Sequence, residues 1–271
     1  MQAPIAQAVA LTIAGNRFLR GEAAGAFWPE ASVFRYCKRV HFVTLSGPDQ
    51  APIADAYAED PPGWMTRVRS EGRTGLRLFH VPSHGTQRDR EMVGFAGGGG
   101  RRLIAAIKED AADLWEARWA VGDRKDPAQK IWTVTYGRVA TGFDVAGESQ
   151  RSVSEIRDEL AASLADITQF AEAQQLENFA ASFRLATGRL ASVTPLEGGW
   201  FAKLDDKDGL DLAARQLLGA AEAAWVFGAM GSWNDLVFKG ETGETYNELS
   251  NRLFALVNEA TVAATNAGLG M

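Results

Sequence analysis

The sequence predicts an α+β protein with two regions. Residues 1–148 are expected to form a mostly antiparallel sheet with a packed helix, and residues 149–271 a bundle of three to four helices. Apolar residues alternate with period two in the first region and recur at helical spacing in the second. The charge changes at the same place, since 1–148 holds 19 basic and 17 acidic residues whereas 149–271 holds 9 and 17. We therefore expect a domain boundary near residue 148.

The chain begins with a predicted amphipathic helix. Ile5, Val9 and Ile13 share one face at helical spacing, and Gly21 is expected just past the helix end. The first sixteen residues carry no side-chain charge, as a secretory signal would, but they have no basic leading segment. They are also too short to span a bilayer, so we expect neither a signal peptide nor a membrane anchor.

The rest of the first region contains six segments that are typical of strands: 40–45, 76–81, 92–96, 101–107, 114–121 and 130–139. In 114–121, Trp115 and Trp119 fall on one side of the strand, and Glu116 and Arg118 on the other. The segment GDRKDPAQ that follows predicts a hairpin loop. We expect Trp115 and Trp119 to be largely buried, with a cost of about 3–5 kcal/mol for Trp119→Ala.

Three helical stretches are expected in the second region. The first starts at the capping box SVSE (152–155) and breaks near Gln174 and Gln175, since an unbroken helix would be unusually long. The second covers about 209–230, after an acidic start that suits the positive end of a helix. The third is expected to start at a further capping box, TYNE (245–248).

A run of glycines and arginines is the most motif-like feature: Gly97, Gly98, Gly99, Gly100, Arg101 and Arg102. It matches neither the phosphate loop, which needs Lys and Ser or Thr after its last glycine, nor the dinucleotide fingerprint, which needs a glycine at Arg102. We favour a hairpin turn between 92–96 and 101–107. The alternative is a helix over 101–118, whose free amides would bind an anion beside the two arginines.

The sequence gives only weak support for a metal site or for a reactive cysteine. His41, His80 and His84 could converge as zinc ligands, but no recognised zinc motif contains them, and we favour structural roles. Cys37 precedes Lys38 and Arg39, which would favour a thiolate, yet a packing role is commoner for a lone cysteine. No metal or cofactor is therefore predicted.

The second predicted helix carries two further features. Glu222 lies within it and is expected to face solvent; the alternative is a buried carboxyl with a raised pKa. Small residues recur around it and would let another helix approach closely: Gly219, Ala220, Ala223, Ala224 and Gly228.

Two functions from different classes remain open, because no catalytic motif is found and enzymatic activity stays uncertain. The first is a protein that acts through protein contacts or through self-association of its helical half, which would make it a homo-oligomer. The single cysteine suggests that such a protein is cytoplasmic. The second is a binding protein or enzyme for a small anionic ligand, phosphate or carboxylate. Its residues would be the Gly97–Arg102 loop with Trp115, Trp119 and Trp132. The net charge of −6 argues against nucleic acid as a partner.

Overall fold

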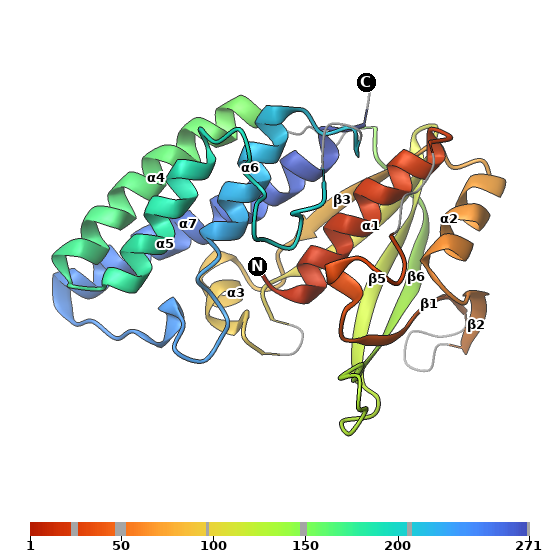
Figure 1. The fold of residues 1–271 in the computed structure, drawn as a ribbon, viewed down its shortest axis with the longest axis horizontal. Coiled ribbons are helices and arrows are strands. Elements are labelled where there is room, and N and C mark those ends of the chain that lie inside the picture. The colour runs from red at the N-terminus through yellow and green to blue at the C-terminus, as the bar shows by residue number, and fades with distance from the viewer. Residues whose placement is uncertain (23–26, 47–52, 96–97, 147–150, 205–207, 270–271) are drawn as a thin grey trace. The chain divides into compact units, whose positions relative to one another are not determined.

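The computed structural model describes residues 1–22, 27–46, 53–95, 98–146, 151–204 and 208–269 (Figure 1). The chain divides into two compact units. We call Met1–Gln2, His80–Arg101 and Gln150–Gly268 the helical unit, and Ala3–Phe79, Arg102–Ser149 and Leu269–Met271 the sheet unit. The segment 80–101 thus belongs to the helical unit, although the sequence placed it in the first region. Whether the two predicted domains fold independently stays a prediction.

Six strands form one sheet: β1 (Cys37–Ser46), β2 (Ile53–Ala58), β3 (Gly75–Val81), β4 (Arg101–Lys108), β5 (Ala111–Val121) and β6 (Trp132–Asp144). Their order across the sheet is β2-β1-β6-β5-β4-β3. β1 pairs with β2, β4 with β5 and β5 with β6 in antiparallel fashion, whereas β1 and β6 run parallel. The α+β class is confirmed, with one parallel pair making the sheet mixed.

One face of the sheet is covered by α1 (Ala3–Leu19) and α2 (Pro61–Ser70), with the short 3-10 helix η1 (Ser32–Phe34) beside α1. Phe42 of β1 stacks on Trp64 of α2 with 4.7 Å between the ring centroids. The Tyr136 hydroxyl donates to Oε1 of Gln7 at 3.1 Å, which ties β6 to α1. The predicted first helix is confirmed, and Gly21 follows it with the positive φ of 83° that ends many helices. The expected amphipathic character of this helix is wrong, because every residue from Ile5 to Ile13 is buried.

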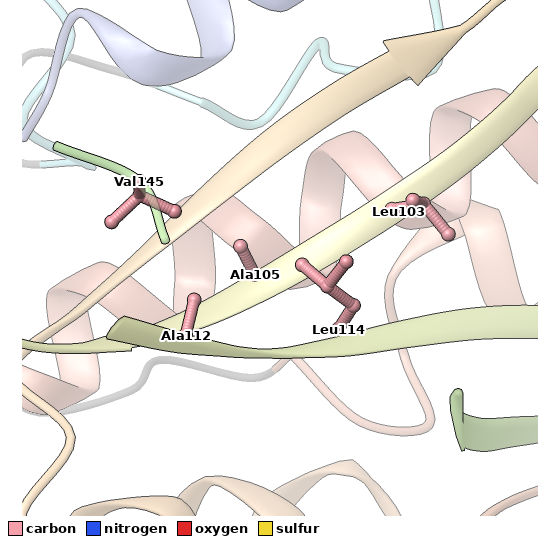
Figure 2. Close-up of a cluster of buried hydrophobic side chains, with 5 residues drawn as sticks. All are labelled: Leu103, Ala105, Ala112, Leu114 and Val145. Atoms are coloured by element: carbon pink, nitrogen blue, oxygen red, sulfur yellow. The ribbon is translucent and has the colours of Figure 1, made fainter. Parts of the chain in front are cut away.

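The opposite face carries a smaller apolar cluster, drawn in Figure 2. Leu103 and Ala105 come from β4, Ala112 and Leu114 from β5, and Val145 from the segment after β6. Alternation along β5 produces both cores, because Leu114 points to this cluster while its neighbour Trp115 contacts Phe42, Tyr57 and Trp64 among the aromatic rings of the other face.

The helical unit contains α3 (Thr86–Met92), α4 (Val153–Ala173), α5 (Glu177–Arg189), α6 (Leu212–Ala223), the 3-10 helix η3 (Trp233–Asp235) and α7 (Gly240–Asn266). Helices α4 to α7 pack together, green to blue in Figure 1. The capping box at Ser152 is confirmed, since Ser152 and Glu155 exchange both hydrogen bonds. The predicted break is confirmed too, because Gln175 has a positive φ of 59° between α4 and α5.

Three expectations are wrong in detail. Residues 92–95 are not a strand, because α3 runs to Met92 and turns follow it; Ala96 lies outside the described residues. The helix expected over 209–230 is shorter, spanning Leu212–Ala223 with the Asp211 side chain as its cap. Thr245 is no cap, since α7 begins at Gly240 and continues through it. Sequence analysis also missed α2, α3 and β2.

Candidate functional site

The glycine run turns the chain from α3 into β4, and its hairpin interpretation is wrong because no strand precedes it. Gly99 and Gly100 have φ angles of 82° and 78°, which favour glycine. A Cβ atom at Gly98 would overlap the Met92 carbonyl, so the loop packs directly on the end of α3. Gly97 lies outside the described residues.

The alternative interpretation of the same loop also loses its basis. Residues Arg101–Lys108 form strand β4, so no helix start presents free amides beside Arg101 and Arg102. Anion binding by these residues stays a prediction. The free backbone amides of a helix start, on which it was based, are not there.

The three tryptophans proposed as a ligand lining separate into two environments. Trp115 is 1% exposed and packs on Tyr57 with 4.8 Å between ring centroids. Trp119 and Trp132 contact each other at 5.9 Å and are both partly buried. The burial prediction is therefore confirmed for Trp115, and it is wrong in degree for Trp119, whose truncation should cost less than that of Trp115.

The histidines do not form a metal site in the described part of the chain. No group of three or more His, Cys, Asp or Glu side chains that could hold a metal ion occurs there. Burial lowers the pKa of His41, which lies 3.2 Å from the Thr135 hydroxyl. Cys37 is buried, and burial raises the pKa of its thiol to about 11, which disfavours a reactive thiolate.

Glu222 is half-buried rather than solvent-facing, so the expected orientation is wrong. Burial raises its pKa, although its Oε1 accepts a hydrogen bond from the Trp200 amide at 2.7 Å. The small residues around it serve packing within the helical unit. A Cβ atom at Gly219 would overlap the Pro195 carbonyl, and Ala220 and Ala224 are fully buried.

A buried arginine clamp, which sequence analysis missed, holds α3 against η3 and α7. Arg90 is 2% exposed and donates from Nε, Nη1 and Nη2 to the side-chain oxygens of Asn251, Asn234 and Asn247 at 2.8, 3.1 and 3.0 Å. Among the described residues, no carboxylate lies within ion-pair distance of its guanidinium. The Asn234 amide donates back to the Arg90 carbonyl at 2.6 Å. Two of these four hydrogen bonds are with Asn234 and hold the loop that contains η3, and the other two are with α7.

The η3 loop, residues 228–239, is anchored from inside and exposes two large apolar side chains, together with the charged Asp235 and Lys239. Trp233 is fully buried, and its Nε1 donates to the Ser250 hydroxyl at 2.7 Å. Met230 and Val237 on either side of it are 101% and 84% exposed. A Cβ atom at Gly94 would come within 3.3 Å of the Gly228 backbone, so the loop packs against the segment that carries Phe95, which is 66% exposed.

The sheet unit contains a second charge cluster, buried at its inner end and exposed at Arg67, which we call the arginine–aspartate cluster: Tyr57, Arg67, Glu71, Arg73, Asp113, Trp115 and Arg138. At its inner end, Oδ2 of Asp113 lies 2.8 Å from Nη2 of Arg73 and 3.3 Å from Nη1 of Arg138. At its outer end, Glu71 lies 3.7 Å from Arg138 and 3.5 Å from Arg67. Arg138 therefore joins the two carboxylates.

Aromatic rings enclose this cluster. The Arg138 guanidinium lies 5.5 Å from the Tyr57 ring centroid and 5.8 Å from that of Trp115, while Arg67 lies 4.1 Å from Tyr57. These distances are typical of cation–π contacts. The pKa of Tyr57 is raised, first by burial and then by the nearby Glu71 carboxylate, although the two side chains make no hydrogen bond of good geometry.

Strand alternation places Asp113 here. It lies two residues before Trp115 on β5 and so shares the face of Trp115, whereas Ala112 and Leu114 belong to the cluster on the opposite face. The pairing of β4 with β5 is regular through Asp113, and the register shifts between β5 and β6 add residues on β6. No local pattern in the sequence predicts that Arg73 and Arg138 meet Asp113.

Membrane crossing finds no support in the described residues, where no helix combines enough length with enough apolar character. Comparison with protein-family models, with curated proteins and with solved structures gives no match.

Proposed function

We propose that the protein acts through protein contacts and self-associates through its helical unit. The observation that carries the proposal is the η3 loop, where Met230 and Val237 are almost wholly exposed while Trp233 and the Arg90 clamp hold the backbone. Apolar side chains gathered on an ordered surface are typical of partner-binding sites.

The energetics favour such a contact. An apolar side chain of this size contributes about 1.5–3 kcal/mol when it is fully removed from water. Because the loop is already fixed by hydrogen bonds, little backbone ordering opposes association. Phe95 would add a third apolar contact from the neighbouring segment.

Charge suggests a competing mode of self-association. Residues 1–148 carry a net charge of +2 and residues 149–271 a net charge of −8, so two copies could dock head to tail through unlike charges. Such docking weakens as salt screens the charges, whereas an apolar contact persists. Ionic strength therefore distinguishes the two modes.

Sedimentation velocity over a concentration series tests the proposal. We expect a dimer that persists in high salt, and roughly 100-fold weaker association for the double variant Met230→Gln/Val237→Thr. Val193→Thr is the matched control, since Val193 is 79% exposed elsewhere in the helical unit. A protein that stays monomeric at every concentration, or a dimer unaffected by the double variant, contradicts the proposal.

A cytoplasmic location is proposed with it. Its support is the single cysteine, Cys37, since secreted domains commonly rely on disulfide pairs.

A further inference from the structure

The arginine–aspartate cluster of the sheet unit has unmet hydrogen-bonding capacity. Four buried polar atoms in it have no hydrogen-bond partner among the residues that the structure describes: Tyr57 Oη, Arg73 Nε, Asp113 Oδ1 and Trp115 Nε1. The residues that carry them are in contact in two pairs. Arg73 donates a hydrogen bond to Asp113, and the rings of Tyr57 and Trp115 pack on each other. Buried polar atoms in native proteins nearly always have partners, so this concentration of unpaired atoms calls for an occupant.

The unpaired atoms define what the occupant must offer. Three of them can donate a hydrogen: the Tyr57 hydroxyl, the Arg73 Nε–H and the Trp115 indole N–H. The fourth, Oδ1 of the Asp113 carboxylate, can only accept. The occupant therefore needs several acceptor oxygens and one hydrogen to donate.

Charge narrows the class further. Arg67, Arg73 and Arg138 contribute three positive charges, against two negative charges from Glu71 and Asp113. One added negative charge would neutralise the cluster. A dianion would exceed that balance and repel the Asp113 carboxylate, which lies at the buried end with 3% of its side chain exposed.

We propose that this cluster is a binding site for a small hydroxy acid carrying a single carboxylate. The carboxylate oxygens accept from Tyr57, Arg73 and Trp115, and the hydroxyl donates to Oδ1 of Asp113. Bound in this way, the ligand pairs all four unpaired atoms and brings the cluster to zero net charge. Glu71 and Arg138, with 33% and 24% of their side chains exposed, form the solvent-facing end.

This site differs from the anion site expected at Gly97–Arg102, and it is independent of the proposed self-association, which uses the helical unit. A failure of one proposal therefore leaves the other intact, because ligand binding and oligomeric state are measured separately.

Calorimetric titration of the full chain with simple probes tests the ligand class. Glycolate has both the carboxylate and the hydroxyl, acetate has only the charge, glycerol has only hydroxyls, and inorganic phosphate is largely dianionic above neutral pH. We expect saturable binding of glycolate, with acetate about fivefold to tenfold weaker for want of one hydrogen bond. Equal binding of acetate, or tighter binding of phosphate, overturns the proposed class.

The indole N–H resonances locate the site. The signal that is missing in the spectrum of Trp115→Phe belongs to the Trp115 indole. In the parent protein we expect this signal to shift when glycolate is added, because the unpaired N–H gains an acceptor. Trp115→Phe, which keeps an aromatic ring, should weaken binding about fivefold to tenfold, and Tyr57→Phe similarly.

Trp119→Phe is the matched control, because its Nε1 is also buried and unpaired but lies beside Trp132, outside the cluster. It should leave glycolate affinity unchanged. No saturable heat and no shift of the Trp115 signal with any probe would overturn the proposal and leave the four atoms to buried water.

Discussion

Two arginine sites in this molecule differ in the partners of their guanidinium groups. In the helical unit, Arg90 is surrounded by the neutral oxygens of three asparagines, with no carboxylate in ion-pair distance among the described residues. In the sheet unit, Arg73 and Arg138 share the buried carboxylate of Asp113. The first site is densely hydrogen-bonded, whereas the second leaves four buried polar atoms unpaired.

The difference separates a structural role from a binding role. The Arg90 clamp places amide oxygens opposite three of the guanidinium hydrogens, and its consequence is a fixed η3 loop. In the arginine–aspartate cluster most of the charges are paired, but several buried polar atoms lack a hydrogen-bond partner. A site that is charged, enclosed by rings and incompletely paired is better suited to accept a ligand than one that is already satisfied.

Removing the shared carboxylate should produce the largest effect. Asp113→Ala leaves Arg73 and Arg138 without their buried counter-ion, and breaking such a pair costs about 3–5 kcal/mol. Urea unfolding of the full chain measures this loss. Glu59→Ala is the control, because the Glu59–Arg39 pair is exposed and should contribute at most about 1 kcal/mol. A loss for Asp113→Ala no larger than the control's would show that the cluster is solvated.

The Arg90 clamp should be less sensitive, because its partners are neutral. Arg90→Met keeps the length of the side chain and removes the cation, so the asparagine amides lose their donor at a cost of about 1–3 kcal/mol. Arg88→Met, on the exposed side of α3, should change unfolding by no more than about 0.5 kcal/mol. An Arg90→Met loss that matches or exceeds the Asp113→Ala loss would contradict the distinction between the two sites.

The same substitution links the clamp to association. If Arg90 fixes the η3 loop, then Arg90→Met should weaken self-association more than Arg88→Met does, even where both variants are folded. Sedimentation velocity of the two variants measures this, and equal association would show that the loop needs no clamp to present Met230 and Val237.

Local sequence signals predicted the regular elements well, because each depends on neighbours in the chain. The reciprocal bonds of Ser152 and Glu155, the break at Gln175 and the alternation of Trp115 with Leu114 are all short-range effects. TYNE at 245–248 failed because tertiary packing of α7 extended the helix past a weaker local start.

The two arginine sites were not predictable in this way. Arg90 meets residues 144 to 161 positions away, and Asp113 meets Arg73 at 40 positions. Such pairs depend on the order of strands in the sheet and on how the helices pack, which no local period encodes. No local pattern in the sequence indicates which arginines would be buried.

The smallest expected effect concerns Glu222, whose partly buried carboxyl should make the free energy of unfolding depend on pH. Its Oε1 accepts from the Trp200 amide, and burial raises the pKa of its carboxyl above the unfolded value of 4.5, although this hydrogen bond and the charges of the Met1 amino group and Arg189 act in the opposite direction. The native state then binds a proton more readily than the unfolded chain, so Glu222 lowers stability as pH rises from about the unfolded pKa to the folded one. Glu222→Gln keeps an acceptor oxygen for Trp200 and removes this loss.

We therefore expect the unfolding free energy of Glu222→Gln to exceed that of the parent by a margin that is smallest near pH 4 and grows with pH before levelling off. Urea unfolding at a series of pH values measures the margin. Glu248→Gln, on an exposed position of α7, should show no such trend. A margin that stays constant with pH, or that shrinks as pH rises, would mean that the Met1 amino group and Arg189 outweigh the effect of burial on Glu222.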